Sequence, residues 1–78
     1  MNSVSINLRT DEVIVKITED ATQEKTIQDL NKKLKDLKKM YKDETTPIRV
    51  VGKILSNKEM EEIRDVITNE INVEVTFD

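Results

Sequence analysis

The apolar residues of this 78-residue chain follow two different periods, which alternate along the sequence. Apolar side chains at every second position are typical of a strand with one buried face, whereas spacings of three and four are typical of a helix. Period two governs residues 3–9, 12–18, 47–51 and 71–77, and the helical period governs two segments between them. The pattern predicts the element order β-β-α-β-α-β.

The predicted strands place apolar side chains toward a core and polar side chains toward solvent. Only Thr10 and Asp11 separate the first two strands, so an antiparallel hairpin is expected, with its turn type left open. Pro47 begins the third strand, where a proline is tolerated, and Gly52 marks its end. The inward residues are Val4, Ile6, Leu8, Val13, Val15, Ile17, Ile48, Val50, Ile71, Val73, Val75 and Phe77.

The first predicted helix has a narrow apolar stripe. Asp20 and Gln23 have the spacing of a capping box, which makes Asp20 the expected N-cap. The helix should end near Lys42, because Pro47 disfavours helical geometry in the residue before it. The stripe spans about 80° of the helical wheel; it comprises Ile27, Leu30, Leu34, Leu37 and Tyr41.

The second predicted helix begins at a clear capping box, with Ser56 as N-cap and Glu59 three residues later. Its apolar face comprises Met60, Ile63, Val66 and Ile67. Short connections after each helix favour right-handed parallel crossovers, which place both helices on one face of the sheet. We therefore expect an α/β (α+β) two-layer sandwich with a four-stranded mixed sheet, formed by residues 1–78 as a single domain. The chain ends directly after a strand, so we expect it to be excised from a longer protein whose C-terminal domain is absent.

Composition argues against an enzyme. The chain has no Cys and no His, which removes Cys/His zinc sites, a cysteine nucleophile and a histidine base. It has one Gly, too few for a Gly-rich phosphate loop. We expect no catalytic residue, no bound metal and no cofactor. No apolar run approaches the roughly 20 residues that span a bilayer, and no signal pattern begins the chain, so a cytoplasmic location is expected.

Charge is distributed unevenly. Residues 25–42 contain seven Lys and two Asp, a net charge of +5, whereas the rest of the chain carries −8. A basic helix face therefore lies beside an acidic second helix, either as solvated surface or as a docking site for an acidic partner. Nucleic acid is not an expected partner, because the net charge is −3 and the sequence has only two aromatic residues for base stacking.

The sheet face away from the helices is the preferred candidate surface. Two apolar residues, Ile14 and Val51, occupy outward positions there, flanked by the cations Lys16 and Arg49. An apolar centre with a charged rim is typical of protein-binding patches, although single exposed apolar residues are also common on ordinary surfaces. The candidate partner-binding residues are Arg9, Ile14, Lys16, Arg49, Val51 and Lys53.

The sequence also resembles a known family. A hairpin precedes the lysine-rich run Lys-Lys-Leu-Lys-Asp-Leu-Lys-Lys-Met-Tyr (32–41), and Gly-Lys-Ile-Leu-Ser (52–56) precedes an acidic helix. This arrangement resembles the N-terminal domain of the septum site-determining MinC family over nearly the whole chain, most specifically at 52–67. The chain departs from the family's Lys-Gly in the first hairpin and from its aromatic pair at the end of the first helix, where Met40 and Tyr41 stand.

The resemblance implies a non-enzymatic domain that binds FtsZ and antagonises its assembly into division rings. It also implies that the absent C-terminal domain supplies dimerisation and contact with MinD, so that the protein approaches the membrane only through a partner, without inserting. The alternative is a regulatory domain of the anti-sigma-factor-antagonist type, phosphorylated at Ser56, although the Asp-Ser-Ser-Gly-type run of that family is absent.

Overall fold

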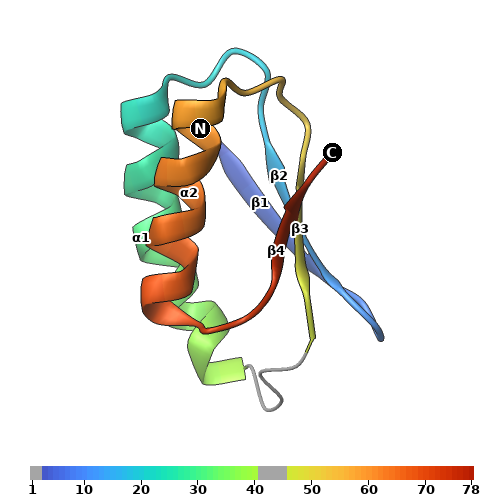
Figure 1. Cartoon of the computed structure of the whole chain (residues 1–78). Helices are drawn as coiled ribbons and strands as arrows, with labels where there is room; N and C mark the ends of the chain where they lie inside the picture. The colour runs from blue at the N-terminus through green and yellow to red at the C-terminus, as the bar shows by residue number, and fades with distance from the viewer. Residues whose placement is uncertain (1–2, 41–45) are drawn as a thin grey trace.

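The computed structural model describes residues 3–40 and 46–78, which form a two-layer domain (Figure 1). The elements are β1 (Val4–Leu8), β2 (Val13–Ile17), α1 (Gln23–Met40), β3 (Ile48–Val51), α2 (Asn57–Glu70) and β4 (Val75–Phe77). The predicted order β-β-α-β-α-β is therefore confirmed. The radius of gyration is 11.4 Å, close to the value of about 11.5 Å that the chain length implies.

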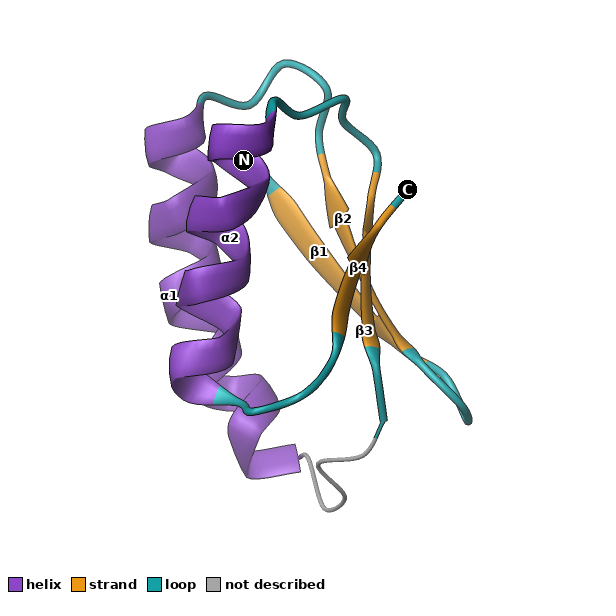
Figure 2. Ribbon diagram, in the orientation of Figure 1, coloured by secondary structure: helices purple, strands orange, loops and turns teal. Residues whose placement is uncertain are grey.

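The four strands form one mixed sheet in the order β1-β2-β3-β4. β1 and β2 are antiparallel, and β2, β3 and β4 are parallel. Both crossovers step across the sheet in the same direction, so their right-handedness places α1 and α2 on the same face. Figure 2 shows the two helices packed side by side over that face, with the opposite face uncovered.

The core lies between the two layers. Inward residues of the strands meet the buried stripes of the helices, and Leu30 and Leu34 of α1 and Ile63 and Ile67 of α2 are fully buried. The predicted capping box of α2 is present, with reciprocal hydrogen bonds between Ser56 and Glu59. The part of the chain that the structure describes has no helix long and apolar enough to cross a membrane.

The beginning of α1 corrects the predicted cap. The helix begins at Gln23, and the hydroxyl of Thr22 accepts a hydrogen bond from the Lys25 N–H at 3.1 Å. Asp20 lies in the preceding turn, too early to cap, so its capping spacing was misleading. Tyr41 and Lys42 lie outside the described residues. The last strand is also shorter than expected, since β4 begins only at Val75. Ile71 and Val73 are buried as predicted, but they lie in the connection before β4.

Two residues at the ends of β1 differ from their predicted positions. Ser3 was expected outward but is buried, because its backbone and hydroxyl hydrogen bond to Asp29 of α1. Leu8 was expected inward but is 54% exposed. Figure 1 shows the reason: the tip of the β1–β2 hairpin turns away from the helices, so the last inward residue of β1 has little above it.

Gly52 ends β3 with a φ of +102°, a conformation that residues with a side chain rarely adopt. A Cβ at this position would collide with the carbonyl oxygen of Ile17. The single glycine of the chain is therefore required by the close approach of the two strand ends.

Candidate protein-binding surface

The uncovered face of the sheet brings together four of the six predicted binding residues. The parallel register of β2 and β3 places Ile14 beside Arg49 and Lys16 beside Val51. Outward positions of the two strands therefore alternate apolar and cationic side chains along and across the sheet. Ile14, Val51 and Arg49 are half-buried by their neighbours on the same face, and Lys16 is exposed.

Arg49 is already engaged in ion pairs. Its Nη2 lies 3.2 Å from Oε2 of Glu12 and its Nη1 lies 3.0 Å from Oδ2 of Asp78. Its Nε is buried and has no hydrogen-bond partner among the described residues. The guanidinium is therefore held between two carboxylates, which largely compensate its charge. Lys16, by contrast, has no ion pair or hydrogen bond with any described residue and is the free cation of this face.

Lys53 lies away from the open face. Its ammonium group donates a hydrogen bond to the carbonyl oxygen of Ala21, which joins the β3–α2 loop to the β2–α1 loop. The next residue, Ile54, is 97% exposed, so this loop carries an apolar side chain at the end of the sheet opposite the hairpin tip (Figure 1). Lys53 thus has a structural contact that the sequence did not predict.

Arg9 is exposed at the tip of the hairpin, just beyond Leu8. Its backbone N–H donates to the carbonyl oxygen of Glu12 at 2.9 Å, which closes the turn. Its side chain forms no hydrogen bond or ion pair with the four central residues in the described part of the chain. The candidate surface therefore comprises Ile14, Lys16, Arg49 and Val51, with Arg9 at its edge.

The two carboxylates described next, whose pKa values are shifted, form hydrogen bonds that stabilise the fold. Hydrogen bonds from the Ser3 hydroxyl and N–H, with the nearby Lys25 ammonium, lower the pKa of Asp29 to about 2. The Ser56 N–H lowers the pKa of Glu59 through the capping box. Neither carboxylate lies on the open face. Within residues 3–40 and 46–78, no cluster of three His, Cys, Asp or Glu side chains is placed to hold a metal ion.

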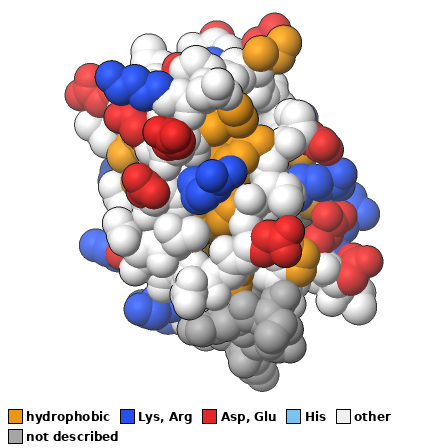
Figure 3. Space-filling view, in the orientation of Figure 1, with side chains coloured by type: hydrophobic (Ala, Val, Ile, Leu, Met, Phe, Trp, Pro, Cys, Tyr) orange, Lys and Arg blue, Asp and Glu red, His pale blue; other side chains and the backbone are white. Residues whose placement is uncertain are grey.

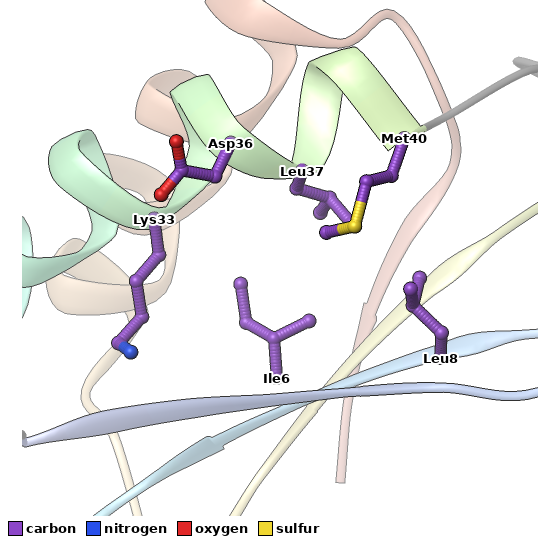
Figure 4. Close-up of a pocket in the computed structure, with 6 residues that line it drawn as sticks. All are labelled: Ile6, Leu8, Lys33, Asp36, Leu37 and Met40. Atoms are coloured by element: carbon purple, nitrogen blue, oxygen red, sulfur yellow. The ribbon is translucent and has the colours of Figure 1, made fainter.

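A second surface feature was not predicted from the sequence. A shallow pocket of about 190 Å³ opens between β1 and the C-terminal half of α1. Figure 4 shows Ile6 and Leu8 projecting from the strand toward Leu37 and Met40 of the helix. Their apolar character is visible in the sequence, but whether they lie at an edge depends on the order of strands in the sheet. The pocket is lined by Ile6, Leu8, Lys33, Asp36, Leu37 and Met40.

The other side of the domain differs in charge and packing. Figure 3 shows apolar side chains at the surface in a band between the helical layer and the strands, with acidic side chains over the helices. The guanidinium of Arg64 on α2 lies 5.6 Å from the ring centroid of Phe77 on β4, within cation–π range. This contact joins α2 to β4, the other edge strand of the sheet.

No protein-family model, no curated protein and no solved structure matches this chain. The class that the fold defines is a two-layer α+β domain with one uncovered sheet face.

Proposed function

We propose that this chain is a non-enzymatic protein-binding domain of the MinC N-terminal type, which antagonises FtsZ assembly and so helps to place the division septum. The observation that supports a binding role is the uncovered sheet face, where Ile14 and Val51 lie between Lys16 and Arg49. The resemblance in residues 52–67 supports the identity of the partner.

The open face has the properties of a recognition surface. A sheet provides a rigid platform, and the β2–β3 register holds Ile14 and Val51 on neighbouring strands at fixed separation. Apolar groups fixed in this way bind without a large loss of conformational entropy. Lys16 adds an unpaired charge that can select an acidic partner, since complementary charge contributes specificity and association rate.

The proposed mechanism involves no chemistry on a substrate. The domain binds FtsZ and either competes with filament contacts or weakens them. In the full-length protein, the C-terminal domain would supply dimerisation and MinD would bring the pair near the membrane, while this domain stays cytoplasmic.

The test is sedimentation of GTP-polymerised FtsZ with and without the purified chain. The wild-type chain should reduce the pelleted fraction of FtsZ. The Lys16→Glu variant should need at least a tenfold higher concentration to give the same reduction. Lys58→Glu, an equal charge change at an exposed position near the start of α2, is the matched control and should behave as wild type. Circular dichroism verifies that both variants are folded.

Two results would count against the proposal in different ways. Unchanged sedimentation and no FtsZ binding at tens of micromolar chain, about −6 kcal/mol, would overturn the FtsZ function itself. An active wild type with a fully active Lys16→Glu variant would leave the function standing and remove the sheet face as its site.

The alternative of phosphorylation at Ser56 gains no support from the geometry. The Ser56 hydroxyl accepts the Glu59 N–H, and the Glu59 carboxylate accepts the Ser56 N–H at 2.9 Å. A phosphate on Ser56 would place its charge beside that carboxylate, a repulsive arrangement. Ser56 is fully explained as the N-cap of α2.

A further inference from the structure

β1 lies at one edge of the sheet, and no described strand pairs with its outer side. In an antiparallel pair, alternate residues direct their N–H and C=O groups toward the neighbouring strand or away from it. The Thr18 N–H donates to the Ser3 carbonyl, and the Arg9 N–H donates to the Glu12 carbonyl, both at 2.9 Å. Odd-numbered residues of β1 therefore bond to β2. The residues whose backbone groups face the free edge are Val4, Ile6 and Leu8.

This edge lacks the features that usually keep an edge strand from pairing with a further strand, which are charged residues, proline and bulges. β1 reads Val-Ser-Ile-Asn-Leu, and its register with β2 is continuous. The other edge strand, β4, is different, because Glu74 and Asp78 flank it. Two copies of β4 paired antiparallel about Thr76 would place Glu74 directly opposite Asp78, a destabilising pair of like charges. Two copies of β1 meet no such repulsion.

A second β1 strand also has the alternation of side chains that this edge requires. Leu8 is 54% exposed and Met40 is 57% exposed, so the pocket beside the edge has apolar walls open to solvent. Any strand added to β1 directs every second side chain to the helical side of the sheet, where the pocket lies. A second β1 presents apolar residues on that side and Ser5 and Asn7 on the open side.

The flank of α1 beside the edge alternates in charge. Lys25 lies 3.3 Å from Asp29, and Lys33 and Asp36 line the pocket. Figure 4 shows Lys33 extending from α1 toward β1. This stripe has no net charge, so it selects neither an acidic nor a basic partner. It is complementary to an antiparallel copy of itself, in which each cation can face an anion.

The positions of α1 and β1 allow this complementarity. Ser3 hydrogen bonds to Asp29, and Leu8 and Met40 line the same pocket, so the two elements run in the same direction. The helix rises about 16.5 Å from Asp29 to Met40, and the strand rises about 16.5 Å from Ser3 to Leu8. The centre of β1 is therefore level with residues 34–36 of α1.

A two-fold axis at the centre of β1 consequently places Lys33 of each copy within about one helical turn of Asp36 of the other. The remaining lysines of this half of the helix do not lie at that contact. They are turned about 100° or more from Lys33 around the helix; they are Lys32, Lys35, Lys38 and Lys39.

We infer that two copies of this chain pair through the free edges of β1, antiparallel about a two-fold axis at Ile6. Val4 of each copy then lies opposite Leu8 of the other, and Ser5 lies opposite Asn7. The pairing joins the two sheets into one and covers the exposed apolar side chains beside the edge. Both open faces stay uncovered on the other side of the joined sheet, so the inference is independent of the proposed function.

The experiment is sedimentation equilibrium of the purified chain from about 10 μM to 1 mM, the weak end of specific affinities. The apparent mass should rise toward twice that of one chain. On the ¹⁵N-labelled chain, the amide protons of Val4, Ile6 and Leu8 should gain protection from exchange as the concentration rises. In a mixture of labelled and unlabelled chains, isotope-filtered NMR should detect a contact between the Hα protons of Ser5 and Asn7 of different copies.

Charge variants test the register. Asn7→Lys brings two ammonium groups near each other across the axis and should raise the dissociation constant of the dimer at least tenfold. Asn69→Lys, the same change at an exposed position of α2, is the matched control and should dimerise as wild type. Adding Ser5→Glu to Asn7→Lys places opposite charges across from each other, which should restore the wild-type dissociation constant. Circular dichroism verifies that each variant is folded.

Three outcomes would overturn the inference. The first is a monomer throughout the concentration range. The second is equal dissociation constants for Asn7→Lys and Asn69→Lys. The third is a dimer whose intermolecular contacts lie at β4 or the open face, or join β1 of one copy to β2 of the other, which would mean that the strand is exchanged. If Asn7→Lys does not fold, the contact between Ser5 and Asn7 in the wild-type chain decides alone.

Discussion

Ser3 and Asp29 are joined by two hydrogen bonds to one oxygen. The Ser3 N–H and the Ser3 hydroxyl both donate to Oδ2 of Asp29, at 2.9 and 2.6 Å. The other oxygen, Oδ1, lies 3.3 Å from the Lys25 ammonium. Asp29 is 5% exposed, so these contacts are largely shielded from water. They fix the beginning of the edge strand β1 against α1.

This arrangement predicts an acid-sensitive component of stability. The hydrogen bonds from Ser3 lower the pKa of Asp29 from 3.8 to about 2 in the folded protein. The folded state therefore holds the proton less tightly than the unfolded state, and the contribution is fully present above pH 3.8 and lost as the pH falls through 2. Urea unfolding at pH 7, 5, 4, 3 and 2 should show wild type losing more stability below pH 4 than Asp29→Asn. Parallel curves for the two proteins would contradict this account.

The Ser3 hydroxyl contributes separately from the Ser3 backbone. Ser3→Ala removes the 2.6 Å hydrogen bond and keeps the N–H bond to Asp29. A hydrogen bond to a charged group contributes about 1.5–3 kcal/mol, so a loss at the lower end of that range is expected. Ser5→Ala is the matched control, because Ser5 lies two residues further along, in β1, and is exposed. If Ser3→Ala lowers the free energy of unfolding no more than Ser5→Ala does, water has taken the place of the Ser3 hydroxyl as the donor to Asp29.

Gly52 should be the least replaceable loop residue. In Gly52→Ala, the new Cβ has to avoid the Ile17 carbonyl oxygen while the backbone keeps a φ of +102°. Positive-φ strain alone costs about 1–3 kcal/mol, and the collision adds to it. Urea midpoints measure the effect, with the exposed Asn69→Ala as a surface control expected to stay within about 0.5 kcal/mol of wild type. A midpoint for Gly52→Ala equal to that of Asn69→Ala would rule out the close approach.

The capping role of Ser56 also gives a specific expectation. Ser56→Ala removes the acceptor for the Glu59 N–H and should cost about 1 kcal/mol, whereas Ser56→Asp keeps an acceptor there and should cost less. Thermal unfolding of the two variants provides the comparison. If both variants lose the same stability, repulsion between Glu59 and the new aspartate cancels the stabilisation that the aspartate provides as an N-cap.

The sequence predicted the element order, most of the inward residues of the strands and the α2 cap, because these depend on local periodicity and spacing. Ser56 and Glu59 form their reciprocal pair within four residues, and no distant contact has to be known. The buried position of Ser3 depends on Asp29, 26 residues away. The engagement of Lys53 depends on Ala21, 32 residues away. Such pairings follow from tertiary packing and cannot be found from spacing.

The candidate surface was predictable in part for the same reason. Alternation places Ile14, Lys16, Arg49 and Val51 on the outward face as soon as β2 and β3 are neighbours. The pairing of Arg49 with Glu12 and Asp78 requires the register, which the sequence does not provide. The exposure of Leu8 requires the twist of the hairpin away from the helices, a property of the whole sheet.

The ion pairs of Arg49 determine how its variants should be interpreted. Its side chain is 39% exposed, so solvent screens both pairs, and Arg49→Gln should cost less than about 1 kcal/mol. The loss should shrink in 1 M salt, where screening acts over about 3 Å. Lys16→Gln, which breaks no such pair, should show no salt-dependent loss. A larger loss for Arg49→Gln that persists at high salt would mean that the guanidinium holds β2, β3 and the end of β4 together. Charge reversal at Arg49 would then report on folding, and Lys16 would be the residue with which to test binding on the open face.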